Sequence, residues 1–404
     1  MELLQPKLRF IEFKNQWIKT KLGTLGVFKG GGTPSTNKAN YWQGNTPWIS
    51  SSDIVENDIF NINITRYISD EAIDESAVKI VPLNSVLFVS RVGVGKLAVS
   101  NLNLCTSQDF ANLTPKKDNS WFIAYYFLSK NKLLHQYAQG TSIKGFTTGD
   151  LKSIPINIPS LPEQQKIVSF LTDVDNKITV LTKKKALLEQ YKKGVMQKIF
   201  NQELRFKDDE DNDFPNWQKN KLGKLVKFLK GKGLPKSEIV SDGQYKCIHY
   251  GELFTKYNEQ ITNIISRTND NNNTVLSKIN DVLMPTSDVT PNGLATASCI
   301  KELDVILGGD ILIIRQDIKK IEGVYLAYYI KHFRNDVMKL VSGSTVYHLY
   351  GSDMKNLQVL IPCLDEQIKI ANFLTDIDLK ITVLNTKIES NQTFKKGLLQ
   401  KMFV

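Results

Sequence analysis

The stretch FLTDVDNKITVL, Phe170–Leu181, returns as FLTDIDLKITVL, Phe373–Leu384, 203 residues later in a chain of 404. The similarity extends further, since residues 161–200 align without a gap on residues 364–403 and 22 of the 40 aligned positions are identical. Apolar residues in both copies recur at alternating spacings of four and three, the period of helices that pack side by side in a coiled coil. We therefore predict two long, related helices that pack together.

The predicted packing seam has the same positions in both helices. If the helices run antiparallel, pairing residues whose numbers sum to 569 places Ile167 opposite Met402 and every other seam position opposite a seam position. Polar seam residues such as Lys192 are expected to weaken the packing locally. The apolar seam residues are Ile167, Leu171, Val174, Ile178, Leu181, Ile370, Leu374, Ile377, Ile381 and Leu384.

The predicted helices also carry signals at their ends. The sequence SLPE gives the first helix a start, with Ser160 as N-cap and Glu163 closing a capping box. Gly194 and Gly397 occupy equivalent positions near the two C-termini. A glycine costs about 1 kcal/mol inside a helix, so we expect these two to mark fraying or close packing.

The segments before the two helices are related as well, which makes the chain two full repeats. FIAYYFLSK at 122–130 corresponds to YLAYYIKHF at 325–333, and LRF followed by a tryptophan begins both repeats. Between these landmarks the copies diverge, and short apolar strands such as SVLFVS and DILIIR lie between Gly, Asn and Pro turns. We predict an α/β (α+β) fold with globular domains at 1–159 and 201–362, of which 201–217 is a linker, and long helices at 160–200 and 363–404.

The composition favours a polyanionic partner. Lysine and arginine number 52 against 41 acidic residues, a net charge of +11, which suits nucleic acid. The four cysteines form no CxxC pair, so neither a zinc module nor a disulfide framework is indicated. The N-terminus resembles no export signal, and no apolar run is long enough to span a membrane. We expect a cytoplasmic protein.

A basic protein with two domains could be a nuclease or a methyltransferase, but its candidate catalytic motifs are incomplete. FKGGG at 28–32 only superficially resembles a methyl-donor loop, and GKGLPKS lacks the spacing of a P-loop. Glu12 and Lys14 have no upstream aspartate to complete a nuclease triad, and the four histidines have no arranged partners. We predict no catalytic residue and no metal site. A self-contained DNA methyltransferase or nuclease, and a coiled-coil scaffold without DNA function, remain the alternatives.

Candidate DNA-binding residues lie in the basic and glycine-rich segments of the two predicted domains. Arginine suits bidentate reading of guanine, whereas lysine beside glycine suits phosphate, the role expected of Lys230. Aromatic and histidine side chains in the loop before the second helix could either contact bases or pack within the domain. The candidates are Lys29, Arg91, Lys96, Lys144, Lys230, Lys232, Tyr347 and His348.

Nearly the whole chain resembles the specificity (S) subunits of type I restriction-modification systems. The resemblance rests on the arrangement of GGTPST, NTPWISSSDI, NSVLFVSRVGVGKLAVS, GTSIKGFTTGDLKSIPINIPSLPEQQKI and the second-repeat ending LIPCLDEQIKI. The second domain departs from the common pattern, with KGKGLPKS and MPTSDVTPNG in place of GGTPS and SRVGVG.

The resemblance implies an antiparallel coiled coil between two target-recognition domains, each reading one half of a split double-stranded DNA site. It implies that the chain itself has no catalytic activity and holds no cofactor. Two methyltransferase subunits would bring S-adenosylmethionine to methylate adenine, and restriction/translocase subunits would supply cleavage with ATP and Mg. The DNA sequence that is read is not encoded in any of these motifs.

Overall fold

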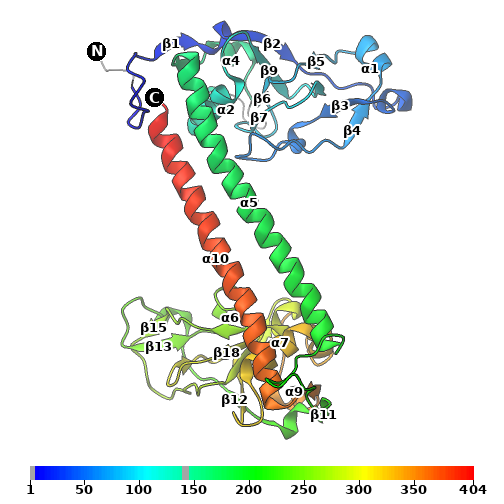
Figure 1. The fold of residues 1–404 in the computed structure, drawn as a ribbon, viewed down its shortest axis with the longest axis vertical. Helices are drawn as coiled ribbons and strands as arrows, with labels where there is room; N and C mark the ends of the chain where they lie inside the picture. The colour runs from blue at the N-terminus through cyan, green and yellow to red at the C-terminus, as the bar shows by residue number, and fades with distance from the viewer. Residues whose placement is uncertain (1–4, 139–144) are drawn as a thin grey trace. The chain divides into compact units, whose positions relative to one another are not determined.

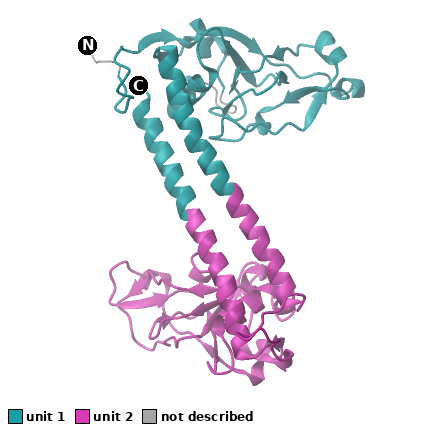
Figure 2. Ribbon diagram, viewed as in Figure 1, with its two compact units in different colours: residues 1–182, 386–404 teal, residues 183–385 magenta. Residues whose placement is uncertain are grey.

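The protein is described by a computed structural model that covers residues 5–138 and 145–404 (Figure 1). The chain forms two compact units, Met1–Thr182 with Thr386–Val404, and Lys183–Asn385 (Figure 2). The two long helices are α5 (Leu161–Phe200) and α10 (Leu364–Met402). Each is shared between the units, so that unit 1 holds the first half of α5 and the last half of α10, and unit 2 holds the other halves. Two antiparallel helices produce this division, because the first half of one helix then lies beside the last half of the other.

Unit 1 is built on three small sheets with short helices beside them. Strands β1 and β10 form one pair, and the others form sheets in the orders β2-β9-β6-β7 and β4-β3-β8-β5. The strands are β1 (Ile18–Lys21), β2 (Gly26–Gly30), β3 (Thr46–Ile49), β4 (Arg66–Ile68), β5 (Ile80–Val81), β6 (Val86–Val89), β7 (Leu97–Val99), β8 (Leu104–Thr106), β9 (Phe110–Pro115) and β10 (Pro155–Ile158). The helices are α1 (Asp70–Glu75), α2 (Ser120–Ser129), α3 (Asn131–Tyr137) and α4 (Thr148–Ser153).

Unit 2 repeats this plan with a different interior. Its sheets are β11-β22, β12-β20-β16-β18-β14, β15-β13-β19 and β17-β21. The strands are β11 (Gln218–Lys221), β12 (Val226–Lys230), β13 (Tyr245–Ile248), β14 (Gln260–Ile261), β15 (Arg267–Thr268), β16 (Val282–Pro285), β17 (Ser287–Asp288), β18 (Ser298–Ile300), β19 (Ile306–Leu307), β20 (Ile311–Gln316), β21 (Tyr347–His348) and β22 (Gln358–Ile361). The helices are α6 (Glu252–Thr255), α7 (Gly323–His332), α8 (Arg334–Met338) and α9 (Gly351–Met354).

The predicted fold class, with its internal repeat, is confirmed. The pair β1-β10 corresponds to β11-β22, the sheet of β2, β9, β6 and β7 to that of β12, β20, β16 and β18, and α2 to α7. Helices α2 and α7 begin at side-chain caps, Asn119 accepting from Trp121 and Phe122 N–H and Glu322 accepting from Val324 N–H. Seven residues of α2 and eight of α7 are buried, so each is a core helix of its unit.

A buried hydrogen-bonded triad fixes the start of each long helix. Glu163 of α5 accepts from Arg9 Nε at 2.7 Å and from Trp17 Nε1 at 3.2 Å, while Glu366 of α10 accepts from Arg205 and Trp217 in the same way. Among the described residues these are the partners of the Glu163 carboxylate, so the predicted capping box with Ser160 is wrong. The repeated glutamate holds the repeated LRF and tryptophan segments against the helix instead.

The seam residues are buried or half-buried, and ion pairs set the register. In unit 1 Lys395 of α10 pairs with Asp175 of α5 at 2.6 Å, and in unit 2 Lys192 of α5 pairs with Asp378 of α10 at 2.7 Å. Both pairs have residue numbers that sum to 570, within one residue of the predicted pairing. A tyrosine of the adjoining core helix, α2 or α7, donates to each aspartate.

These contacts correct two expectations about the seam. Lys192 and Lys395 were expected only to weaken the packing, but each satisfies an aspartate of the opposite helix. Gly194 and Gly397 were expected to mark fraying or close packing. Both helices continue past them, and a Cβ atom added at either would meet nothing within 4 Å. That prediction is wrong, because these glycines face open space.

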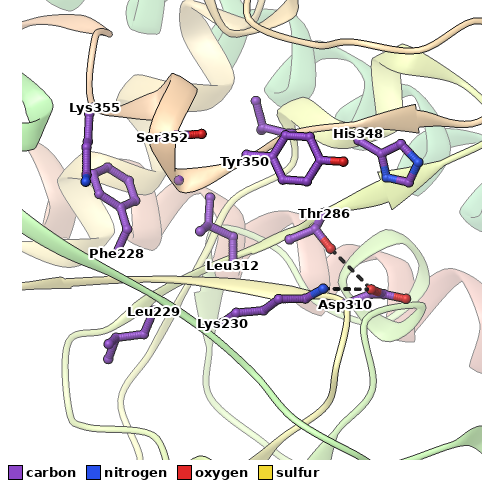
Figure 3. A pocket seen from close by; sticks show the side chains of 12 residues that line it. Phe228, Leu229, Lys230, Thr286, Asp310, Leu312, His348, Tyr350, Ser352 and Lys355 are labelled. Carbon is purple, nitrogen blue, oxygen red and sulfur yellow. Dashed lines mark hydrogen bonds and ion pairs between the residues drawn. The ribbon is translucent and has the colours of Figure 1, made fainter.

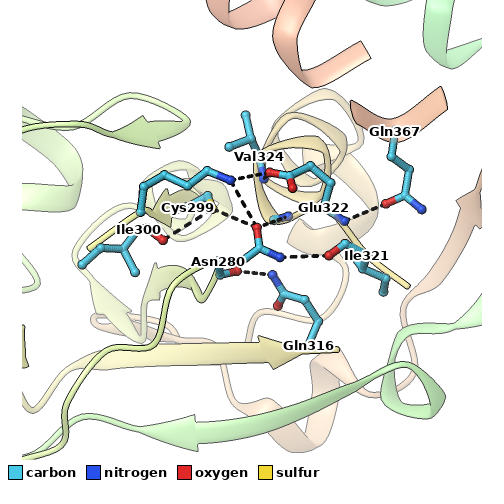
Figure 4. Close-up of polar contacts among 10 residues, drawn as sticks. Asn280, Cys299, Ile300, Gln316, Ile321, Glu322, Val324 and Gln367 are labelled. Atoms are coloured by element: carbon cyan, nitrogen blue, oxygen red, sulfur yellow. Dashed lines mark hydrogen bonds and ion pairs between the residues drawn. The ribbon is translucent and has the colours of Figure 1, made fainter. Parts of the chain in front are cut away.

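Within unit 2, Asn280 ties the central sheet to α7 and α10 (Figure 4). Its carboxamide accepts from Gly323 N–H at 2.8 Å and from Lys301 at 3.3 Å, and donates to the Ile321 carbonyl at 2.9 Å. Glu322 N–H in turn donates to Gln367 of α10 at 2.9 Å. The turn before α7 is therefore hydrogen-bonded to the turn before β16 on one side and to the long helix on the other.

Candidate nucleic-acid interface

Unit 2 carries an open pocket of about 390 Å³ with an apolar floor and a polar rim (Figure 3). Phe228, Leu312 and Leu349 lie at its base. The rings of His348 and Tyr350 stack with centroids 5.9 Å apart and planes 16° from parallel. A concave surface that combines rings with polar groups suits contact with the edges of base pairs, which present hydrogen-bonding atoms and, at thymine, an apolar methyl group.

The polar rim of this pocket places a cation beside a carboxylate. Lys230 Nζ, at the end of β12, lies 3.7 Å from Asp310 Oδ1, just before β20. Thr286 donates its N–H to the Asp310 carbonyl at 2.9 Å and lies beside the Asp310 carboxylate, with Thr286 Oγ1 3.4 Å from Asp310 Oδ1. Lys230 is 65% exposed and Asp310 47% exposed, so both side chains present polar groups to solvent.

Unit 1 holds a similar pair at the corresponding place. Arg91 Nε lies 3.7 Å from Asp109 Oδ1, and Ser90 N–H donates to the Asp109 carbonyl at 2.7 Å. Arg91 also donates to the Gln108 carbonyl at 3.0 Å and forms a backbone bridge with Gly145. The matching backbone bonds identify Asp109 with Asp310.

The remaining sequence candidates are distributed over both units. Lys29 of β2 is half-buried and donates to the Ile80 carbonyl at 3.1 Å, and Lys96 is half-buried just before β7. Lys232 is exposed and reaches Asn273 at 3.4 Å. Tyr347 is half-buried and packs against the core of unit 2. Lys144 lies outside the described residues.

The structure thus brings Lys230 and His348 to one pocket, and it adds residues that sequence reasoning missed. Asp109 and Asp310 were not predicted, although SQDFANL and GGDILII place an aspartate at the head of equivalent strands. Phe228 and Lys355 were missed as well, because strand β12 and the turn after α9 carry no motif that marks them. Both residues line the pocket, which forms only when β12 pairs with β20.

A second exposed surface runs along one flank of the long helices. On α5 it includes Val180, Leu187 and Tyr191, which are 54% to 66% exposed. On α10 it includes Val383 and Phe394, 45% and 52% exposed. If the seam residues are positions a and d of the heptad, these five residues occupy positions c and g. Positions c and g lie on the same side of the seam. Val180 and Phe394 belong to unit 1 and their repeat equivalents Val383 and Tyr191 to unit 2, so each unit presents one valine and one aromatic ring.

The nucleophilic and metal-binding side chains show no assembled site in the described ranges. Burial raises the pKa of Cys105 and of Cys247 to about 11 and that of Cys299 to about 12, which keeps these thiols protonated at neutral pH. Burial also lowers the pKa of His249 and of His332. Residues 5–138 and 145–404 contain no group of three His, Cys, Asp or Glu side chains that could hold a metal ion. No helix in these ranges is both long and apolar enough to cross a bilayer.

Comparison with known proteins finds related sequences in both repeats. The family described as type I restriction modification DNA specificity domain matches residues 14–190 and again residues 215–391. The type I restriction enzyme MjaIX specificity subunit of Methanocaldococcus jannaschii is 31% identical over 55% of this chain. The match covers 54% of that relative's length. The putative MjaX specificity subunit of the same organism is 24% identical over 84% of this chain and 82% of its own. The EcoR124I/EcoR124II specificity subunit of Escherichia coli is 31% identical over 43% of this chain and 44% of its own.

Solved structures share the fold. The S subunit of a type I restriction-modification system from M. genitalium superposes with a TM-score of 0.66 at 16% identity, covering 99% of both chains. A chain from a structural study of complex assembly and conformational transition of the type I R-M system superposes with a TM-score of 0.56 at 17% identity, covering 96% of this chain and 97% of that one. At this level of identity the likeness concerns the fold.

Proposed function

Because this chain belongs to the family of type I restriction-modification DNA specificity domains, we propose that it is the DNA-recognition subunit of a type I restriction-modification complex. Residues 1–159 and 201–362 form its two target-recognition domains, each reading one half of a bipartite double-stranded DNA site. The observation that carries the proposal is the duplicated frame with divergent contents. Equivalent sheets and core helices recur in the two units, while the rims that face solvent carry different side chains.

The proposal assigns the chemistry to other chains. Adenine methylation would come from two methyltransferase subunits carrying S-adenosylmethionine, and cleavage from restriction/translocase subunits with ATP and Mg. This chain supplies DNA sequence recognition and no catalytic group. We expect the purified chain with S-adenosylmethionine to leave duplex DNA unmethylated, and the same mixture to methylate adenine once the methyltransferase subunit is added. Methylation by the chain alone would reject this assignment in favour of a self-contained methyltransferase.

Exchange of one domain tests the recognition function. Replacing residues 201–360 by the equivalent domain of a relative should change one half of the methylated motif and preserve the other, because each half-site is read by one domain. Mapping N6-methyladenine in a genome that expresses the chimaera with its methyltransferase subunit measures both halves at once. A motif altered in both halves, or in neither, would contradict the assignment of one domain to one half-site.

The exposed flank of the long helices is the proposed docking surface for the methyltransferase subunits. Two units with equivalent valine and aromatic positions offer equivalent sites to two identical partners. Changing Val180 and Phe394 to lysine should remove one methyltransferase subunit from the complex, and changing Val383 and Tyr191 should remove the other. Native mass spectrometry counts the subunits. Thr179→Lys, exposed on the other flank of α5, is the control and should leave two partners bound.

A further inference from the structure

An aspartate recurs at the head of β9 and of β20, in the rims of the two units. Asp109 and Asp310 occupy equivalent positions, since each accepts through its carbonyl the N–H of a hydroxyl residue that follows the preceding buried strand, Ser90 or Thr286. In both units a cation lies 3.7 Å from the carboxylate. The arrangement therefore recurs although the loops around it differ.

The cation reaches this aspartate from a different strand in each unit. In unit 1 it is Arg91, and the equivalent residue of unit 2 is Ser287. In unit 2 it is Lys230, whose equivalent in unit 1 is Gly30, because Gly30 pairs with Ala111 and Lys230 with the equivalent Leu312. The cation has thus changed its position in the chain while remaining beside the same carboxylate.

Structural stabilisation does not account for this pairing. An N···O separation of 3.7 Å is longer than a hydrogen bond, and exposed ion pairs contribute only about 0–1 kcal/mol. Arg91 is 51% exposed and Lys230 65% exposed. Asp310 is 47% exposed, whereas Asp109 is 21% exposed and accepts from Ser107 Oγ at 3.3 Å. Each rim therefore presents a donor beside a carboxylate that still reaches solvent.

A donor beside an acceptor matches the edge of one base pair in the major groove. A G·C pair presents the O6 and N7 acceptors of guanine next to the N4 amino donor of cytosine. Arginine and lysine donate to guanine O6 and N7, and aspartate accepts from cytosine N4. A cation and an aspartate that lie side by side can therefore bind both bases of one pair at once, the cation donating to guanine and the aspartate accepting from cytosine.

We infer that each pair, Arg91 with Asp109 and Lys230 with Asp310, reads a single G·C base pair, one in each half-site. The cation binds guanine and the carboxylate binds cytosine. This inference rests on the proposed function and assigns Lys230 to base reading, which differs from the phosphate role expected from sequence. In unit 2 the stacked rings of His348 and Tyr350 lie on the same rim and would flank the base pair.

The test is to map the methylated motif of variants of the full chain expressed with its methyltransferase subunit. Asp310→Asn and Lys230→Gln should relax the same single G·C position in one half-site. Asp109→Asn and Arg91→Gln should relax one G·C position in the other half-site. In each variant the unaltered half-site reports that the protein is folded. Lys230→Arg keeps the donor and should keep the motif.

Competition binding of the same complexes gives the magnitude. At the affected position, discrimination between G·C and the other base pairs should fall by roughly tenfold to a hundredfold, the range for loss of a good base contact. Asp74→Asn and Asp242→Asn make the same charge change at exposed sites of the two units and should change nothing.

Two outcomes separate the inference from the function on which it rests. If the unmodified chain directs sequence-specific methylation but the two members of a pair affect different positions, an A·T position or none, the inference is overturned and the proposed function stands. If the unmodified chain directs no sequence-specific methylation, the proposed function fails and the inference fails with it.

Discussion

Residues that occupy equivalent positions in the two repeats differ in how tightly they are packed. Glu163 and Glu366 are both nearly fully buried, and each forms an ion pair with an arginine and accepts a hydrogen bond from a tryptophan of the segment that opens its own repeat. A buried carboxylate must be paired, so the start of each helix depends on contacts with residues far away in the sequence. Gly194 and Gly397 are the opposite case, repeated residues with nothing packed around them.

These glycines yield a prediction about stability. Because both lie in helix interiors and a Cβ would meet no atom, Gly194→Ala and Gly397→Ala should each stabilise the isolated chain by about 1 kcal/mol. Thermal and urea unfolding of the two single variants and of the double variant measure the effect. Gly26→Ala is the matched opposite, since its Cβ would fall 2.1 Å from the Thr114 carbonyl, and it should destabilise. An unstable Gly194 variant would mean that the helix is strained there.

The long helices combine apolar packing with one polar crosslink beside the seam residues of each unit. Lys395 and Asp175 are 15% and 14% exposed, and Lys192 and Asp378 are 13% and 17% exposed. Tyr125 and Tyr328 donate to the aspartates, and burial followed by the neighbouring carboxylate raises the pKa of each tyrosine, which keeps the phenol a donor. A one-residue slip of the helices would separate lysine from aspartate, so these pairs specify register.

The ion pair yields a prediction for the helix pair. Lys395→Met leaves Asp175 buried without its cation and should destabilise the protein by about 3–5 kcal/mol, the usual result of removing one partner of a buried pair. Lys395→Met combined with Asp175→Leu should recover most of this loss, because no charge remains buried. Urea unfolding of both variants and of Asp175→Leu closes the cycle. A double variant as unstable as the single one would show that the pair contributes net stability rather than register.

At the scale of the whole molecule, the connection between repeats resembles the meeting of the two chain ends. In unit 2 Leu204 N–H donates to the Lys198 carbonyl at 3.1 Å, across the covalent link from α5 to the second repeat. In unit 1 Leu8 N–H donates to the Lys401 carbonyl at 2.9 Å, at the same place in the repeat. The same backbone hydrogen bond therefore forms whether the chain is continuous at this place or not.

This equivalence predicts that the chain tolerates circular permutation. Joining Val404 to Pro6 through two glycines and opening the chain between Glu210 and Asp211, in the exposed acidic turn, should give a folded protein. It should melt within a few degrees of the original and direct methylation of the same motif. Opening the chain within α7, a buried helix, is the control and should prevent folding. A misfolded first permutant would show that Leu8 and Lys401 need an open chain end.

The duplication, the two long helices, their antiparallel register to within one residue and the α/β class could all be predicted from the sequence, because they follow from periodicity and self-similarity along one chain. It could not place Asp109 or Asp310, since an aspartate before a strand is an ordinary turn residue until two more strands bring a cation beside it. Nor could it distinguish Glu163 as a cap from Glu163 as the buried partner of Arg9, which lies 154 positions away. These points became visible in the packed fold, because the charge of a side chain can be read from the sequence, whereas its partner is set by how the strands and helices pack.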